Sequence, residues 1–294
     1  MLRWLTSRGA RHTAVLREAQ ALTPDVWRDI LGAYEFLRGL SEAESQALRQ
    51  RTAWILASKS FHGTHGLTVT PAMRHAIAAQ AALPILGLDT SLYQGWTQIV
   101  IYPGGFLVPR IEVDDAGVVH EYTMETSGES WEGGPVILSW EDIHREDGAN
   151  VVIHEFAHKL DQRAGGADGM PELRAHHGLD PQHWHHVLEH AFKDFNARLD
   201  AVETAIPPHV DPESDAAEPW YAGLPLDPYA ASDLAEFFAV SSEGFFTDPE
   251  PLARAWPDWY DLLARYYRQD PRRRLAAASA METAIGTAPP HRPA

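Results

Sequence analysis

The chain has 294 residues, 45% of them hydrophobic, and a formal net charge of −17 at pH 7. This length and composition predict a globular protein with a sizeable core, and the acidic balance argues against a nucleic-acid binder, which needs a clustered basic face. Because the chain has no cysteine, disulfides and thiolate chemistry are excluded, and a metal site would need His, Asp or Glu ligands. No apolar run reaches the roughly 20 residues of a membrane span and the N-terminus lacks the apolar segment of a secretory signal, so we expect a cytoplasmic protein.

The first third of the chain shows three helix starts. Each combines an N-cap residue with a proline at the first helical position or with a glutamate three residues later. They are Thr23-Pro24, Ser41 with Glu44, and Thr70-Pro71. We therefore predict a helical N-terminal portion over residues 1–85.

The apolar pattern changes from about Trp96 onward. Short β-branched or aromatic runs separated by Gly and Asp are typical of strands. These runs are Thr97–Pro103, Gly117–Met124 and Gly134–Trp140. A helical pattern returns at about Gly148, and the closing stretch GTAPPHRPA has no apolar residues to bury. The sequence thus predicts an α+β fold with a sheet-containing domain over 86–284 and a disordered tail over 285–294.

The stretch VVIHEFAHKL, Val151–Leu160, places titratable groups in an apolar helical pattern. Residues four apart share a helix face, so His154 and His158 lie side by side and Glu155 lies one step around. This HExxH arrangement is typical of two imidazole ligands to zinc and a glutamate that accepts a proton from the attacking water. A chain with 16 histidines can show the pattern by chance. A buried helix, however, tolerates such groups only with partners, and a metal supplies them.

A catalytic zinc site usually has a third protein ligand. The best candidate is Glu236, which lies among Leu, Ala, Phe and Val side chains, where a carboxylate is costly unless it is paired or metal-bound. An ion pair with an arginine is the alternative for this residue. Glu243 shares the helix face but follows two serines, so we rank it lower, as a group behind the ligands or a solvated residue.

Three further features have both a functional and a structural interpretation. Asp161 could orient a histidine through the free ring nitrogen or could lie exposed at a helix end. His183, His186 and His190 share a helix face in the His-rich segment 176–190 and could bind a second metal, although exposed histidines on a helix are common. The aromatic residues within 256–267 are expected to pack the closing helix onto the core.

The motif HEFAHKLD, together with the later pattern YxxxxxxEFFAVxSExFF, resembles the Mlc titration factor A family of bacterial cytosolic zinc peptidases. The resemblance implies a gluzincin-type site related to the catalytic domain of anthrax lethal factor. It implies that one zinc ion is held by His154, His158 and Glu236 and that Glu155 is the base. It also implies that Tyr229 assists catalysis, and a phenol O–H beside the metal can donate to an oxyanion. The structural alternative for Tyr229 is a surface turn.

The same resemblance implies a zincin-like metallopeptidase core with a short sheet and an active-site helix. It favours hydrolysis of small peptides with aminopeptidase-like action, and a transcriptional repressor as a protein partner. The alternative function is a regulatory module that sequesters the repressor and has mainly structural zinc, although structural sites usually have four ligands, often cysteines. Because zincins pair an extended peptide with an edge strand, we expect Gly134–Trp140 to receive the substrate.

Overall fold

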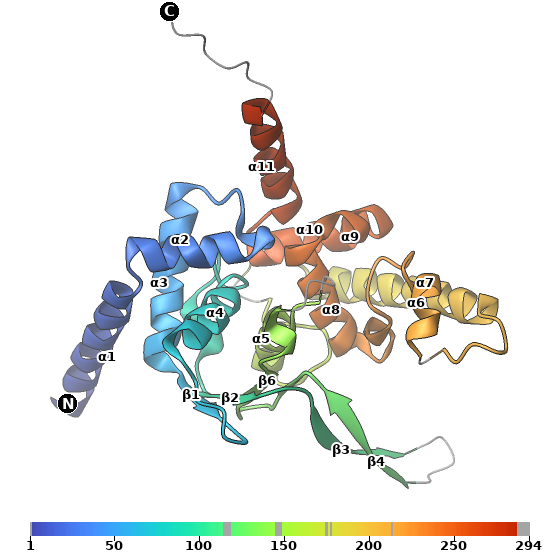
Figure 1. Cartoon of the computed structure of the whole chain (residues 1–294), viewed down its shortest axis with the longest axis horizontal. Coiled ribbons are helices and arrows are strands. Elements are labelled where there is room, and N and C mark those ends of the chain that lie inside the picture. The colour runs from blue at the N-terminus through green and yellow to red at the C-terminus, as the bar shows by residue number, and fades with distance from the viewer. Residues whose placement is uncertain are drawn as a thin grey trace, which may run out of the picture.

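The computed structural model describes residues 2–113, 119–144, 149–173, 176, 178–212 and 214–286. Over these residues the predicted α+β class is confirmed, because helices precede and follow a small sheet. Figure 1 shows the N-terminal helices on one side, most C-terminal helices on the other, and helix α5 between them beside the sheet. No helix of the described part is both long and apolar enough to cross a membrane.

Four helices occupy most of the N-terminal portion. They are α1 (Leu2–Ala21), α2 (Pro24–Ala33), α3 (Glu42–Ser58) and α4 (Pro71–Ala82). All three predicted helix starts are confirmed, since the side chains of Thr23, Ser41 and Thr70 each accept a hydrogen bond from a backbone N–H three residues later.

The sheet has four strands in the order β1-β2-β6-β5. Their bounds are β1 (Ser60–Gly63), β2 (Gln98–Tyr102), β5 (Gly128–Ser130) and β6 (Val136–Ser139). The first three in this order are parallel to one another, and β5 runs antiparallel to β6. A separate hairpin of β3 (Phe106–Val113) and β4 (Val119–Thr126) projects from the body, as Figure 1 shows.

Each of the three strands predicted from sequence is present, as β2, β4 and β6, whereas β1, β3 and β5 were not predicted. The expectation that Gly134–Trp140 forms the edge strand is wrong. Its strand β6 lies between β2 and β5, and all four of its residues are buried. A continuous apolar run is what a strand covered on both faces requires. The edge on this side of the sheet is β5.

The second half of the chain is mainly helical. Its helices are α5 (Val151–Asp161), α6 (Pro181–Ala205), α7 (Glu218–Tyr221), α8 (Leu234–Thr247), α9 (Pro249–Ala255), α10 (Pro257–Tyr267) and α11 (Pro271–Gly286). The aromatic residues of α10 are buried in the core, as predicted: Trp259, Tyr260, Tyr266 and Tyr267 are at most 5% exposed. The predicted tail overlaps the last two residues of α11, and 287–294 lie outside the described residues.

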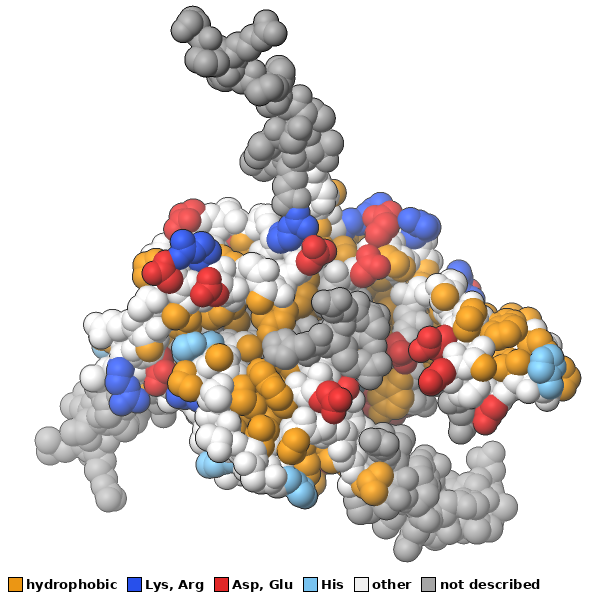
Figure 2. All heavy atoms as spheres, viewed as in Figure 1, with side chains coloured by type: hydrophobic (Ala, Val, Ile, Leu, Met, Phe, Trp, Pro, Cys, Tyr) orange, Lys and Arg blue, Asp and Glu red, His pale blue; other side chains and the backbone are white. Residues whose placement is uncertain are grey.

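One hydrophobic core joins the two halves of the chain. Fully buried side chains from α3, α4, β2, α5 and α8 belong to the same cluster, among them Leu48, Ile77, Ile99, Phe156 and Phe237. Helix α5 is therefore enclosed by apolar neighbours from both sides. On the face seen in Figure 2, acidic side chains are spread over the surface with the lysines and arginines among them rather than in one block.

A buried cluster of two lysines and a tryptophan ties α5 to the preceding elements. The Lys59 Nζ donates to the carbonyls of Tyr93 and Trp96 at 2.5 and 2.8 Å and lies 3.6 Å from the centre of the Trp96 ring. Lys159 of α5 lies on the same ring at 5.1 Å and donates to the Trp131 carbonyl after β5 at 2.5 Å. The cluster therefore fixes the distance between α5 and the edge of the sheet.

The stability of this cluster should depend on pH. Burial, and secondarily the nearby Lys159, lowers the pKa of Lys59 to about 7, whereas the unfolded value is about 10.4. Between these values the unfolded chain binds more protons, so the free energy of unfolding should rise with pH. We expect wild type to gain on the order of 1–3 kcal/mol relative to Lys59→Met between pH 7 and pH 9.5. Urea unfolding at both pH values measures this difference, and a constant difference would contradict the prediction.

Candidate functional site

Helix α5 carries the HExxH motif and begins at a buried cap. The Asn150 Oδ1 accepts a hydrogen bond from the Ile153 N–H at 2.9 Å, which satisfies one of the free donors of the first turn. The apolar residues of the helix are buried or partly buried on every side. Every polar side chain on α5 that faces the interior therefore needs a partner in the surrounding protein.

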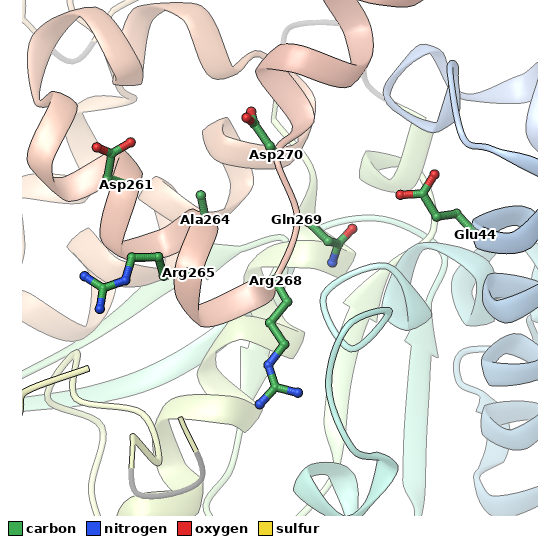
Figure 3. A pocket seen from close by; sticks show the side chains of 7 residues that line it. All are labelled: Glu44, Asp261, Ala264, Arg265, Arg268, Gln269 and Asp270. Atoms are coloured by element: carbon green, nitrogen blue, oxygen red, sulfur yellow. The ribbon is translucent and has the colours of Figure 1, made fainter. Parts of the chain in front are cut away.

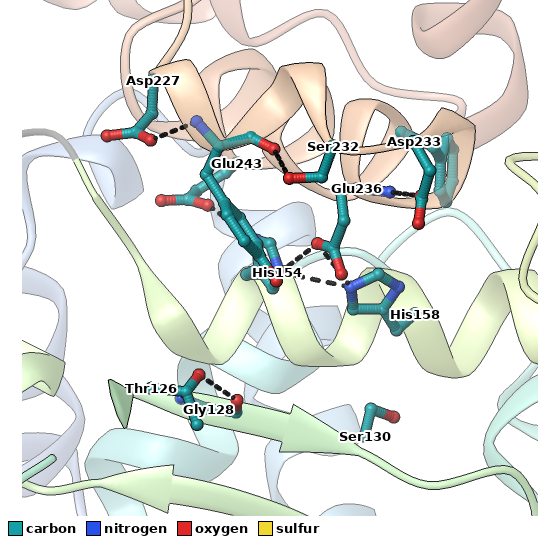
Figure 4. Close-up of polar contacts among 12 residues, drawn as sticks. Thr126, Gly128, Ser130, His154, His158, Asp227, Ser232, Asp233, Glu236 and Glu243 are labelled. Carbon is teal, nitrogen blue, oxygen red and sulfur yellow. Dashed lines mark hydrogen bonds and ion pairs between the residues drawn. The ribbon is translucent and has the colours of Figure 1, made fainter. Parts of the chain in front are cut away.

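Three ligand-type atoms from α5 and α8 converge beside this helix. The Glu236 Oε2 lies 3.1 Å from the His154 Nε2 and 3.2 Å from the His158 Nε2, and the two nitrogens lie 3.2 Å apart. Figure 4 shows both imidazoles and the carboxylate pointing toward one another. One ligand atom of each residue lies within 4.8 Å of the others, so these three residues could hold a metal ion. His154, His158 and Glu236 are called the ligand group below.

The electrostatics of this group favour a cation. Burial by itself would lower the pKa of His154, but hydrogen bonds to Glu236 and Glu243 raise it well above its ordinary value. Burial would raise the pKa of Glu236, yet its bonds with the two histidines hold it well below the usual range. Negative charge is thus concentrated around the imidazoles, and the donor set of two nitrogens and one carboxylate oxygen suits zinc.

Glu243 lies behind His154, on the side away from Glu236. Its Oε2 is 3.2 Å from the His154 Nδ1, and its Oε1 accepts from the Asn150 backbone N–H at 2.5 Å. Because a carboxylate is an acceptor, the imidazole donates through Nδ1 to Glu243, and its Nε2 faces the ligand group. With Glu243 only 9% exposed, the solvated alternative for this residue is excluded.

Glu155 lies against the edge strand rather than in the ligand group. It is 3% exposed, and burial raises the pKa of its carboxyl to about 7. A Cβ at Gly128 of β5 would meet its Oε1 at 2.4 Å, so the glycine leaves the space that the carboxyl occupies. Its Oε2 has no hydrogen-bond partner among the described residues. A buried carboxyl with this free oxygen is suited to accept a proton from a bound molecule.

Tyr229 lies in the 3-10 turn η6 (Pro228–Ala231), which leads into α8. The turn begins at Asp227, whose Oδ1 accepts from the Tyr229 backbone N–H at 2.8 Å. Asp233 caps α8 in the same way and accepts from the Glu236 N–H at 2.9 Å. The Tyr229 ring centre lies 6.1 Å from that of His154, and the residue is 38% exposed. The structure therefore brings Tyr229 beside the ligand group.

Other candidates make no hydrogen bond or ion pair with the ligand group in the described part of the chain. Asp161 is fully buried, which excludes an exposed helix end, and its Oδ2 accepts from the Gly169 backbone N–H at 2.8 Å. His183, His186 and His190 are exposed on α6, and no metal-binding group found among the described residues contains them. Sequence reasoning missed Gly128 and Asn150, although an asparagine directly before an apolar helical run is a cap signal.

A shallow hollow of about 500 Å³ lies elsewhere on the molecule. Figure 3 shows the residues that line it, which come from α3, α10 and the segment after α10. They are Glu44, Asp261, Ala264, Arg265, Arg268, Gln269 and Asp270. The lining mixes both signs of charge and includes no residue of the ligand group, so α5 and α8 carry the candidate site.

Comparison with known proteins gives two results. The family model described as glucose-regulated metallo-peptidase M90 matches residues 6–268. The chain is also 35% identical over 294 residues to Mlc titration factor A of Yersinia pestis (strain Pestoides F) and to that of Yersinia pseudotuberculosis serotype O:1b (strain IP 31758). Each match covers 99% of this chain and 97% of the relative.

The contact of Gly128 with Glu155 predicts a selective defect. In Gly128→Ala the new Cβ would lie 2.4 Å from the Glu155 Oε1 and 2.6 Å from the Val151 Cγ2, so the carboxyl must move. A displacement of about 1 Å in a reacting group can cost on the order of 10²-fold in rate. If Glu155 is a reacting group, we expect hydrolytic activity to fall by that factor while the metal content stays unchanged. Gly166→Ala is the control, because its Cβ would meet nothing within 4 Å; equal activity in the two variants would contradict the prediction.

Proposed function

Because the chain belongs to the glucose-regulated metallo-peptidase M90 family, we propose that it is a zinc-dependent peptidase that hydrolyses small peptides with aminopeptidase-like action. The observation that carries this proposal is the convergence of His154, His158 and Glu236 next to a buried glutamate on the same helix. Three ligands of this kind leave a coordination position open, as a catalytic site requires.

Each group of the site has one role in this proposal. His154, His158 and Glu236 hold one zinc ion, which supplies Lewis-acid chemistry by polarising the scissile carbonyl and acidifying water. Glu155 accepts the proton of the attacking water and returns it to the leaving amine, for which a pKa near neutrality is suited. Tyr229 donates its hydroxyl hydrogen to the oxyanion that forms at the carbonyl.

The strand β5 offers the backbone edge for an extended substrate. In an antiparallel pair of strands, residues alternately face the neighbouring strand with their backbone N–H and C=O groups or point them away from it. The Trp131 N–H donates to the Pro135 carbonyl at 3.2 Å, so Trp131 is one of the residues that face β6. The backbone groups of Gly128 and Ser130 then point away from β6, toward the open side. A peptide that adds to this edge lies beside Glu155, so we propose β5 as the strand that orients the substrate.

Two side chains already contact this edge. The Thr126 Oγ1 donates to the Gly128 carbonyl, and the Gln162 Nε2 donates to the Ser130 carbonyl, both at 2.7 Å. A substrate backbone N–H would replace one of these donors. The short length of β5, three residues, fits small peptides better than long extended chains.

The relatives carry the name Mlc titration factor A. On this name we propose, as a second part, that the chain binds a transcriptional repressor, and we propose the cytoplasm as the place where it does so. A regulatory module without hydrolytic activity is the alternative function. Metal content and peptidase activity of the purified protein, measured beside capture of the repressor, distinguish the two.

Two Glu→Gln substitutions test the peptidase proposal with the same chemical change at different positions. Glu236→Gln should lose most of the bound zinc and all hydrolysis, because a neutral amide is a poor ligand. Glu155→Gln should keep zinc and melting temperature but lose about 10²–10⁴-fold in rate, since the amide cannot accept a proton. Metal analysis, thermal melts and hydrolysis of a chromogenic peptide are the measurements. Wild-type zinc content in Glu236→Gln, or wild-type rate in Glu155→Gln, would refute the assigned roles.

The role of Tyr229 can be tested by removing one atom. In Tyr229→Phe the ring remains beside His154 and only the hydroxyl is lost. Loss of one oxyanion donor lowers kcat by roughly 10²–10³, and we expect zinc content, KM and melting temperature to stay close to wild type. Steady-state kinetics on a small peptide measure the effect. An unchanged kcat would assign Tyr229 a packing role only.

A further inference from the structure

We propose that Gln80 and Asn150 are positioning residues of the metal site, which act on His154 through Glu243. The inference rests on the proposed zinc-dependent function. It means that helix α4, from the N-terminal portion, helps to build a site whose ligands all come from α5 and α8.

A series of contacts runs from Gln80 through Asn150 and Glu243 to His154. Within it, Glu243 joins the His154 imidazole to the start of helix α5, to which His154 itself belongs. The Glu243 Oε2 lies 3.2 Å from the His154 Nδ1, and the Glu243 Oε1 accepts a hydrogen bond from the Asn150 backbone N–H at 2.5 Å. Both groups belong to the N-terminal end of α5, whereas Glu243 belongs to α8. The orientation of the imidazole is therefore set by where Asn150 holds the beginning of α5 against α8.

The second contact fixes Asn150 itself. Its Nδ2 donates to the Gln80 Oε1 of α4 at 2.7 Å, while its Oδ1 caps the helix. Asn150 is 5% exposed and Gln80 is fully buried. The Gln80 Nε2 donates to the Ala76 carbonyl of the same helix at 3.4 Å. A buried amide whose donors and acceptors are paired has one favoured orientation, so the series is rigid as a unit.

Loss of the Gln80 amide should therefore weaken metal binding. A leucine at position 80 leaves the Asn150 Nδ2 unpaired in the interior, which is costly enough to make the side chain turn and the start of α5 shift. The backbone N–H that binds Glu243 moves with it, and the His154 Nδ1 loses its fixed acceptor. Changes to groups that orient metal-binding histidines typically weaken metal affinity by 10–100-fold.

The experiment measures zinc affinity of the metal-stripped full-length chain by competition with a chromogenic chelator. Gln80→Leu should bind zinc about 10–100-fold more weakly than wild type. The matched control is Thr52→Val in α3, which also removes one fully buried side-chain hydrogen bond, to the Leu48 carbonyl at 2.9 Å. Thr52 belongs to the same N-terminal helices but lies outside the series, so Thr52→Val should keep wild-type affinity even where its melting temperature falls.

A second substitution guards against poor folding of Gln80→Leu. In Asn150→Ser the serine keeps a capping oxygen and the backbone N–H to Glu243 but cannot reach Gln80. This variant should also bind zinc more weakly than wild type. Both substitutions break the same contact, the hydrogen bond between Asn150 and Gln80. The double variant should therefore have the zinc affinity of whichever single variant binds more weakly, and not a lower one.

The outcomes separate the two proposals. Weak binding by wild type itself would refute the zinc site, and with it the proposed function. Normal binding by wild type together with normal binding by Gln80→Leu and Asn150→Ser would overturn only the positioning role. Equal weakening in Gln80→Leu and Thr52→Val, or additive weakening in the double variant, would also overturn it, since both results describe general destabilisation.

Discussion

The approach of the Glu236 carboxylate of α8 to two imidazoles of α5 is the contact on which the site depends. A carboxylate taken out of water is costly unless charged or hydrogen-bonded partners surround it. Glu236 has its partners only when His154 and His158 lie one turn apart on a helix packed directly against α8. Asp233 caps α8 and Asn150 caps α5, so each helix begins at a defined residue. These caps thereby set the positions of Glu236, His154 and His158 along their helices.

The motif helix and the place of Glu236 beside it could be anticipated because both depend on local rules. Helical periodicity alone places His154 and His158 on one face, and the apolar neighbours of Glu236 mark a carboxylate that needs a partner. Helix starts were equally local, since a capping side chain bonds a backbone N–H only three residues away. The family resemblance added Tyr229, which the residues alone would have assigned to a surface turn.

Features that depend on distant parts of the chain could not be predicted. The edge strand β5 has three residues and no apolar alternation, so only its pairing with β6 defines it. Gln80 lies in an alanine-rich helix, and its burial becomes apparent only when the start of α5, 70 residues later, packs against it. For the same reason the partner of Asp161, the backbone of Gly169, is not visible in the helical pattern.

The limited exposure of the ligand side chains has a kinetic consequence. His154, His158 and Glu236 have side-chain exposures of 12%, 10% and 19%. An ion held by these three side chains would have most of its surroundings supplied by protein and only a small opening to solvent. Its exchange with the medium would then depend on local opening around the site, the short turn at Tyr229 included, and not only on the strength of the coordination bonds. The residence time of such an ion would in part be a property of how firmly this turn is held.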